Sequence, residues 1–175
     1  MCSSDLKRSE DLEVKVYIAN LGKYNEGVLQ GSWFSLPVDF DFVSEKIGLN
    51  NEYEEYAIHD FESPIDIPEY ISIDELNNMY NKLCEIEEWG IVEADIKILV
   101  SEMGGLDELY NNLDSIVNHG CISLEDYAYE YLEEYLSGID VGSWLLNYID
   151  YDKYVNDICI WGHFIEGGDL YEIVD

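Results

Sequence analysis

The chain has 175 residues, of which 47% are hydrophobic and 14% aromatic, and it carries 39 Asp and Glu against 8 Lys and Arg. Acidic disordered segments lack the apolar residues that offset the entropy of ordering, so this composition excludes a disordered acidic tail and indicates a folded protein. The formal net charge of −31 excludes direct binding to nucleic acid or to an anionic membrane surface, because both would repel the chain.

The first part of the chain predicts a small antiparallel sheet with one helix. Residues 1–12 are polar and without a period, so we expect a loose N-terminal extension before a domain that spans residues 13–71. Alternating apolar residues predict strands at three places: Val14–Asn20, Val28–Phe34 after a turn between Gly22 and Gly27, and Glu55–Phe61.

The predicted helix lies between the second and third strands. Phe40, Val43 and Ile47 share one helical face, and Gly48 is placed to end the helix. Asp41 and Glu45 lie four residues apart on another face, which we expect to point to solvent.

The middle of the chain, residues 72–117, predicts a helical domain. Ser72 and Glu75 have the spacing of a capping box, and a helix with apolar residues at helical spacing follows them. Two further apolar stripes are separated by Gly104-Gly105 and run through two groups of residues: Val92, Ile96, Leu99, Val100 and Met103, and then Leu106, Leu109, Tyr110 and Leu113.

Residues 118–175 predict a C-terminal α+β domain. Ser123 is placed to cap, and Gly138 to end, a helix that we expect to turn Tyr131 and Tyr135 inward. Residues 144–155 are expected to be helical with breaks. A strand pair is then predicted at Ile158–Ile165 and Leu170–Val174, joined by Glu166-Gly167-Gly168.

These elements together predict an α+β protein built as an elongated chain of three small domains. The charge favours the elongated shape, because B-DNA carries one charge per about 1.7 Å and 31 charges therefore match roughly 50 Å of duplex. A globule of this chain length would be only about 40 Å across. A rod would lower the repulsion between the carboxylates.

The cysteines indicate a reducing compartment. Cys2, Cys84, Cys121 and Cys159 are widely spaced, form no Cys-x-x-Cys pair and follow no signal peptide. We therefore expect a cytoplasmic protein whose cysteines are small buried side chains.

No motif predicts catalysis, a metal site or a cofactor. With 39 acids in the chain, close carboxylate pairs arise by chance, and no segment has the spacing of a calcium loop. His59, His119, His163 and Cys121 do not have the sequence spacing that zinc ligands usually have. Neither Gly104-Gly105 nor Gly167-Gly168 lies in the sequence pattern of a phosphate-binding loop.

The acids themselves are the remaining functional signal. Carboxylates three or four residues apart on a helix are about 5–6 Å apart at Cβ, close to the separation of phosphates along a strand, so a Lys- and Arg-lined DNA groove can accept them. We expect the acids that imitate phosphates to be Asp41, Glu45, Glu52, Glu54, Glu55, Asp60, Glu62, Asp74, Glu75, Glu125, Asp126, Glu130, Glu133 and Glu134.

Three other interpretations compete with DNA mimicry. An acidic surface is usually a solvated face, and halophilic adaptation also produces one. A second alternative is an acidic binding module for another basic protein, such as a nucleoid protein, a chaperone client or a transcription regulator. A carboxylate-dependent enzyme is the third.

Four segments resemble the ArdA family of antirestriction proteins, which conjugative plasmids and transposons carry. They are VYIANLGKYNEG at Val16–Gly27, GSWFSLPVDFDFVSEKIGLNNEYEEYAIHDFE at Gly31–Glu62, LNYIDYDKYVNDI at Leu146–Ile158 and FIEGGDLYEIVD at the end. The third is similar to the segment described in that family as the antirestriction motif. The resemblance covers roughly Val14–Asp175, with a diverged stretch at Cys84–Gly120.

The resemblance implies an inhibitor that is not an enzyme: a curved mimic of B-form DNA that occupies the DNA site of the methyltransferase core in type I restriction-modification enzymes. It also implies a homodimer formed through the C-terminal region. The motif is apolar and aromatic enough to be interpreted as dimer interface and core, and its residues of interest are Leu146, Tyr148, Ile149, Asp150, Tyr151, Asp152 and Tyr154.

Overall fold

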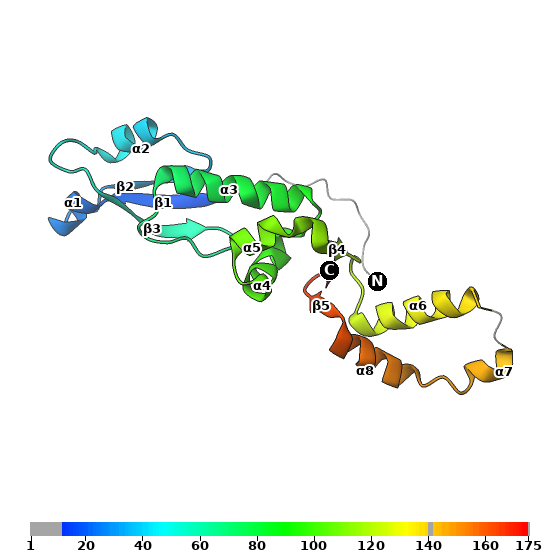
Figure 1. The fold of residues 1–175 in the computed structure, drawn as a ribbon. Coiled ribbons are helices and arrows are strands. Elements are labelled where there is room, and N and C mark those ends of the chain that lie inside the picture. Colours follow the sequence, from blue (N-terminus) through cyan, green and yellow to red (C-terminus); the bar gives the residue numbers. More distant parts are fainter. Residues whose placement is uncertain (1–11, 140–141, 175) are drawn as a thin grey trace.

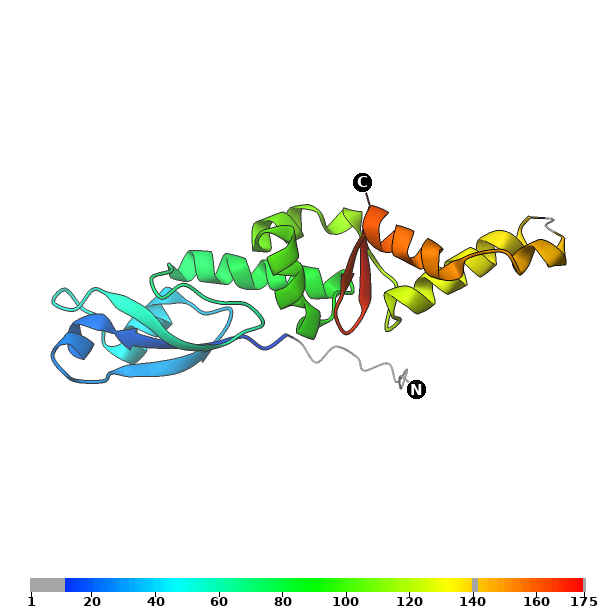
Figure 2. The ribbon, with the colours of Figure 1, turned by 90° about the horizontal axis from the view of Figure 1, so that it is seen from below.

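The computed structural model describes residues 12–139 and 142–174, without the side chains of Ser143, Leu146, Cys159 and Trp161. It has an α+β fold with two antiparallel sheets of three strands each. In both Figure 1 and Figure 2 the elements follow one another along a single long axis, which confirms the predicted elongated shape. In the part of the chain that is described, no helix is long and apolar enough to cross a membrane.

The first sheet has the order β2-β1-β3, and α2 packs against it. Strand β1 alternates so that Val16 and Ile18 are fully buried, while Gly48, at φ 71°, ends α2 in the left-handed conformation that glycine adopts readily. The elements of this unit are β1 (Lys15–Asn20), α1 (Leu21–Asn25), β2 (Gly31–Ser35), α2 (Phe40–Ile47) and β3 (Tyr56–Glu62).

Helix α3 runs beside this sheet and is hydrogen-bonded to the segment between β2 and α2 (Figure 1). The Asn77 side chain accepts a hydrogen bond from Val38 N at 2.9 Å and donates one to Val38 O at 2.8 Å. The predicted capping box of Ser72 and Glu75 is present at the start of α3. The following elements are α3 (Ile73–Glu88), α4 (Glu93–Met103), α5 (Leu106–Asn111) and a 3-10 turn at Leu113–Ser115.

The second sheet has the order β4-β6-β5, and two longer helices extend from it. Helix α6 packs against α8, with α7 near the far end of this pair (Figure 1). We call α6, α7 and α8 the C-terminal arm. The elements are β4 (Ile116–Asn118), α6 (Leu124–Ser137), α7 (Ser143–Leu146), α8 (Tyr151–Trp161), β5 (His163–Glu166) and β6 (Leu170–Ile173).

One continuous hydrophobic cluster joins the first sheet, α3, α4, α5 and the second sheet. It begins at Leu12 and includes Ile18, Leu83, Leu99 and Tyr171. The arm contributes only Ala128 and Leu132 to the buried apolar residues that the structure describes.

Several sequence-based expectations were wrong in detail. The predicted strand Ile158–Ile165 is helical up to Trp161, and only β5 is extended. The second strand begins at Gly31, where its pairing with β1 starts, while Val28 and Leu29 before it are 50% and 66% exposed. The expected turn after Asn20 contains α1, and β4 was not predicted.

Candidate functional site

Every acid predicted to imitate a phosphate is exposed. They come from α2, from the loop before β3, from β3 itself, from the first turn of α3 and from α6. Figure 1 shows α2 and β3 at one end of the molecule and α6 at the other. The structure therefore does not bring these acids into one cluster but distributes them along the body.

Strand β3 places two of these acids on the same face of the first sheet. Asp60 lies opposite Tyr17, and Glu62 lies opposite Lys15, whose Nζ is 3.9 Å from the Glu62 carboxylate and 2.8 Å from that of Glu13. Asp60 and Glu62 are two residues apart and both are exposed, whereas Ile58 is buried. The register shift between β1 and β3 at Tyr17 and Ile18 interrupts the alternation and separates the two acids from Ile58.

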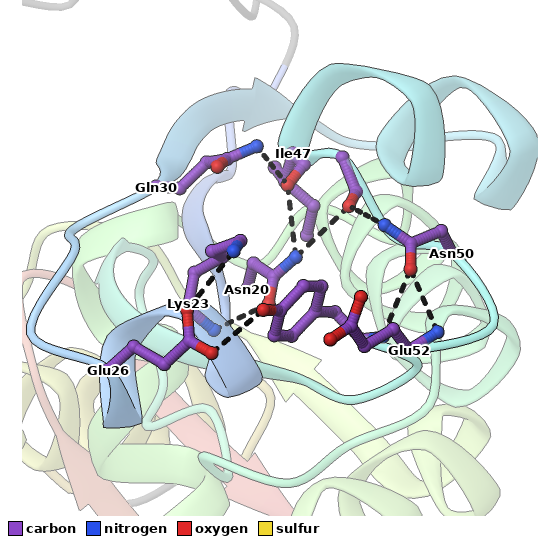
Figure 3. Close-up of polar contacts among 9 residues, drawn as sticks. Asn20, Lys23, Glu26, Gln30, Ile47, Asn50 and Glu52 are labelled. Carbon is purple, nitrogen blue, oxygen red and sulfur yellow. Dashed lines mark hydrogen bonds and ion pairs between the residues drawn. The ribbon is translucent and has the colours of Figure 1, made fainter.

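A polar network holds the loop that carries Glu52, Glu54 and Glu55 (Figure 3). The fully buried Asn20 side chain donates to Ile47 O at 3.3 Å and Gly48 O at 3.2 Å. Gln30 donates to Ile47 O and Asn50 donates to Gly48 O, at 2.8 and 3.3 Å. These bonds satisfy the carbonyls at the end of α2, which have no partner within the helix.

The same network fixes the backbone from which Glu52 projects (Figure 3). The Asn50 carboxamide oxygen accepts from Glu52 N at 2.8 Å and from Tyr53 N at 3.2 Å. The Tyr53 hydroxyl donates to Glu26 at 2.8 Å, and Lys23 Nζ lies 3.1 Å from the Glu26 carboxylate and 3.8 Å from the Tyr53 ring centroid. The Tyr53 and Lys23 hydrogen bonds lower the pKa of Glu26. Sequence reasoning missed Glu26, because its partner Tyr53 is far along the chain.

One of the acids at the helix starts, Glu75, is also part of a cap. The Ser72 side chain and backbone N donate to the Glu75 carboxylate at 2.8 and 3.3 Å, and the side-chain bond is the larger cause of the lowered pKa of Glu75. At the start of α6, the predicted N-cap Ser123 accepts from Asp126 N at 3.1 Å. Negative charge at a helix N-terminus is also favoured by the helix dipole.

Four lysines of the described chain pair with acids of the same chain. Besides Lys15 and Lys23, Lys82 lies 2.6 Å from Asp107, and Lys97 lies 3.7 Å from Asp66. Exposed ion pairs of this kind contribute little to stability, because water and salt screen them. Their main effect is therefore on the surface potential, because each lysine is already offset by a neighbouring carboxylate.

The segment that resembles the antirestriction motif forms the end of α7, a loop and most of α8. Tyr148 is 79% exposed, Asp150 caps α8 by accepting from Lys153 N at 3.0 Å, and Ile149 is half-buried. The side chain of Leu146 lies outside the described part. Asp152 accepts from the Tyr129 hydroxyl at 3.0 Å.

Two motif tyrosines connect α8 to α6. Tyr151 stacks on Tyr129 with ring centroids 5.4 Å apart, and partial burial raises the pKa of Tyr154. The predicted inward position of Tyr131 and Tyr135 was wrong: they are 50% and 61% exposed, because the two-helix arm is too thin to cover both faces of α6.

The cysteines and histidines have ordinary environments in the structure. Cys84 is half-buried, and Cys121 is exposed, so the expectation of a buried side chain was wrong for Cys121; Cys2 and the Cys159 side chain are outside the described part. The His119 ring contacts Glu172 at 2.9 Å and lies against Tyr127. Within residues 12–139 and 142–174, no group of three His, Cys, Asp or Glu gathers as metal ligands would.

Asp95 differs from all the acids above because it is buried, with 3% of its surface exposed. It lies in the first turn of α4 and accepts hydrogen bonds from residues of the β5–β6 hairpin. No local sequence signal marks this contact, since its partners lie more than seventy residues away.

Comparison with known proteins identifies one family. A search of curated proteins finds no match to this chain. The family model described as "Antirestriction protein (ArdA)" matches residues 16–171, which is nearly the whole chain. The match includes the acid-bearing loop, the capped start of α3, the arm and most of the second sheet. The chain therefore belongs to the ArdA family of antirestriction proteins.

Proposed function

We propose that this protein inhibits type I restriction-modification enzymes in the cytoplasm by occupying the DNA channel of their methyltransferase core as a mimic of the duplex. The observation that carries this proposal is the distribution of exposed carboxylates along an elongated body with a net charge of −31. A channel that neutralises the phosphates of DNA has Lys and Arg side chains along its length, and exposed carboxylates spread along a rod can pair with them in the same way.

The binding mechanism rests on many weak contacts. A carboxylate array with the charge density of DNA gathers counterions, and a cationic channel releases them, so the affinity depends strongly on salt. The Asn20 and Asn50 network supports the proposal because it holds the acid loop in place before binding. Little ordering entropy is then lost when the complex forms.

We further propose that the protein acts as a homodimer in which the arms of two copies pack together. The arm exposes a group of large apolar side chains, which is typical of an interface. They are Tyr131, Tyr135, Trp144, Tyr148 and Ile160, at 50%, 61%, 67%, 79% and 74% exposed. Sedimentation of the purified protein tests this part of the proposal: a concentration-dependent dimer is expected.

The central experiment is a titration of restriction and methylation by a purified type I enzyme at several salt concentrations. We compare the protein with a variant in which Glu125, Asp126, Glu130, Glu133 and Glu134 are all Gln. Neutralising them is expected to weaken inhibition strongly and to lower the salt slope by up to about 0.9 per lost contact. A control with exposed Asn51, Asn78 and Asn81 changed to Ser should inhibit like the unchanged protein.

Two results would contradict the proposal. One is a single Glu→Gln substitution that abolishes inhibition with the fold intact, because distributed mimicry gives each acid a small share. The other is capture of nucleoid proteins, with no restriction subunit, when the protein is used as bait in host lysate. That result would favour an acidic module for a different basic protein.

A further inference from the structure

The buried carboxylate of Asp95 forms a clamp on the turn of the β5–β6 hairpin. Oδ1 accepts from Gly168 N at 2.6 Å, and Oδ2 accepts from Asp169 N at 3.0 Å and from the Tyr171 hydroxyl at 2.9 Å. The Tyr171 oxygen in turn accepts from Val92 N at 3.2 Å, just before α4 begins. The Asp95 carboxylate and the Tyr171 hydroxyl therefore each make more than one hydrogen bond.

The turn is shaped to admit this carboxylate. A Cβ added to Gly167 would lie 2.5 Å from Asp95 Oδ1, a distance that real Cβ contacts do not reach, so a side chain there must displace the carboxylate. A Cβ added to the adjacent Gly168 would lie 3.4 Å from both carboxylate oxygens, in ordinary contact. Of these two neighbouring glycines, only Gly167 is required by the approach of Asp95.

The clamped hairpin carries the C-terminal arm. The backbone N of Leu124, the first residue of α6, donates to the Glu166 carboxylate at 3.0 Å, and α8 leads almost directly into β5. A second polar tie lies beside the clamp, where Asn118 Nδ2 donates to Gly90 O at 2.9 Å and to Asp169 at 3.0 Å. Figure 2 shows β5 and β6 between α4 and the two long helices of the arm.

We propose that Asp95 is a positioning residue that fixes the direction of the C-terminal arm and, with it, the spacing between the acids of α6 and those of the first sheet. This inference rests on the proposed mimicry, since two separated groups of carboxylates fit one DNA channel only if their spacing is held. Asp95 does not itself contact the target, because it is buried.

Position 95 needs a carboxylate because both oxygens of the side chain must accept hydrogen bonds. All three groups that face it are donors, two backbone N–H groups and one hydroxyl. Asn at this position keeps one accepting oxygen and turns an amide donor toward Asp169 N or Gly168 N, so one backbone donor loses its acceptor. Asp95→Asn therefore weakens the clamp with almost no change of volume.

The test measures arm position and inhibition in the same variants. Fluorophores on unnatural amino acids at the exposed positions Asn51 and Ser137 report the distance from the first sheet to the arm tip. Asp95→Asn and Gly167→Ala are expected to shift or broaden this distance and to weaken inhibition of a type I enzyme roughly 2- to 30-fold, the range for coupling through residues that touch neither ligand. Gly168→Ala is the matched control and should change neither.

A further control separates positioning from stability. Leu109→Ala makes a cavity in the nearby core and should lower the melting temperature without moving the arm or weakening inhibition below that temperature. An unchanged distance in both clamp variants would overturn the inference, and so would a changed distance with full inhibition. If the unchanged protein fails to inhibit the enzyme, the proposed function fails, while the distances still decide whether Asp95 orients the arm.

Discussion

The first sheet and the C-terminal arm present acids in two different ways. In the first sheet, Val14, Val16 and Ile18 are fully buried, and the loop above them is held by the hydrogen bonds of Asn20 and Asn50. In the arm, α6 buries only Ala128 and Leu132, and its tyrosines are largely at the surface. The acids of the first sheet are thus supported by a hydrophobic core. In our proposal, those of the arm are supported by packing against a second copy of the protein.

The largest expected difference between the regions is in how much free energy of unfolding is lost when a buried side chain is truncated. Ile18→Ala should lower the free energy of unfolding by about 2–5 kcal/mol, because the surrounding sheet and helices relax only partly around the lost atoms. Leu132→Ala should cost less, since its neighbours on a two-helix arm can close over the gap. Urea unfolding of both variants measures the two costs, and equal values would show that the arm is packed as tightly as the sheet.

The Asn20 network should contribute the next largest effect. Asn20→Ala is expected to lower the free energy of unfolding by about 1–3 kcal/mol, because buried carbonyls of α2 lose a donor and α1 loses its cap. Asn51→Ala, at an exposed position in the acid-bearing loop, is the control and should stay within about 0.5 kcal/mol. A similar cost for the two variants would mean that the network adds nothing.

A smaller effect is expected at the capping box of α3. Ser72→Ala should cost about 1 kcal/mol at neutral pH and raise the pKa of Glu75 toward its ordinary value, measured by an NMR titration. Because the pKa of Glu75 is lowered in the folded state, its contribution to stability is present at neutral pH and is lost as pH falls through that lowered pKa. The cost of Ser72→Ala should therefore shrink in acid, and a constant cost would contradict this linkage.

The smallest effect on stability is expected at the arm surface. Tyr148→Ser should change the stability of the monomer by less than about 0.5 kcal/mol, since the side chain is 79% exposed. In the proposed dimer the same change should raise the dissociation constant, which sedimentation measures. A large loss of monomer stability would show that Tyr148 packs within its own chain.

Local rules predicted much of this fold. The capping box of Ser72 and Glu75, the N-cap Ser123 and the left-handed Gly48 each depend on residues within one helical turn, and each was confirmed. The exposure of the predicted acids follows equally from the cost of burying a charge. The domain limits at residues 71 and 117 stay predictions.

What was missed depends on contacts between distant segments. The run Ile158–Trp161 has the apolar, β-branched character of a strand, but it continues α8, a helix that contacts α6. Strand β4 is three residues long and is formed by pairing with β6, which no local pattern announces. Asp95 is similar: among 39 acids it has no distinguishing neighbours, and its burial depends on the turn at Gly167 and Gly168.

The pairing of Lys15, Lys23, Lys82 and Lys97 with carboxylates of the same chain has a consequence for the kinetics of encounter. Because a neighbouring carboxylate offsets each of these four lysines, none of the four forms a positive patch that would oppose the approach to the proposed cationic channel. Long-range attraction then acts over many approach angles, and such steering can raise association rate constants by about 10- to 1,000-fold at low ionic strength. If the protein acts as proposed, fast association as well as high affinity would let it occupy the restriction enzyme before incoming DNA does.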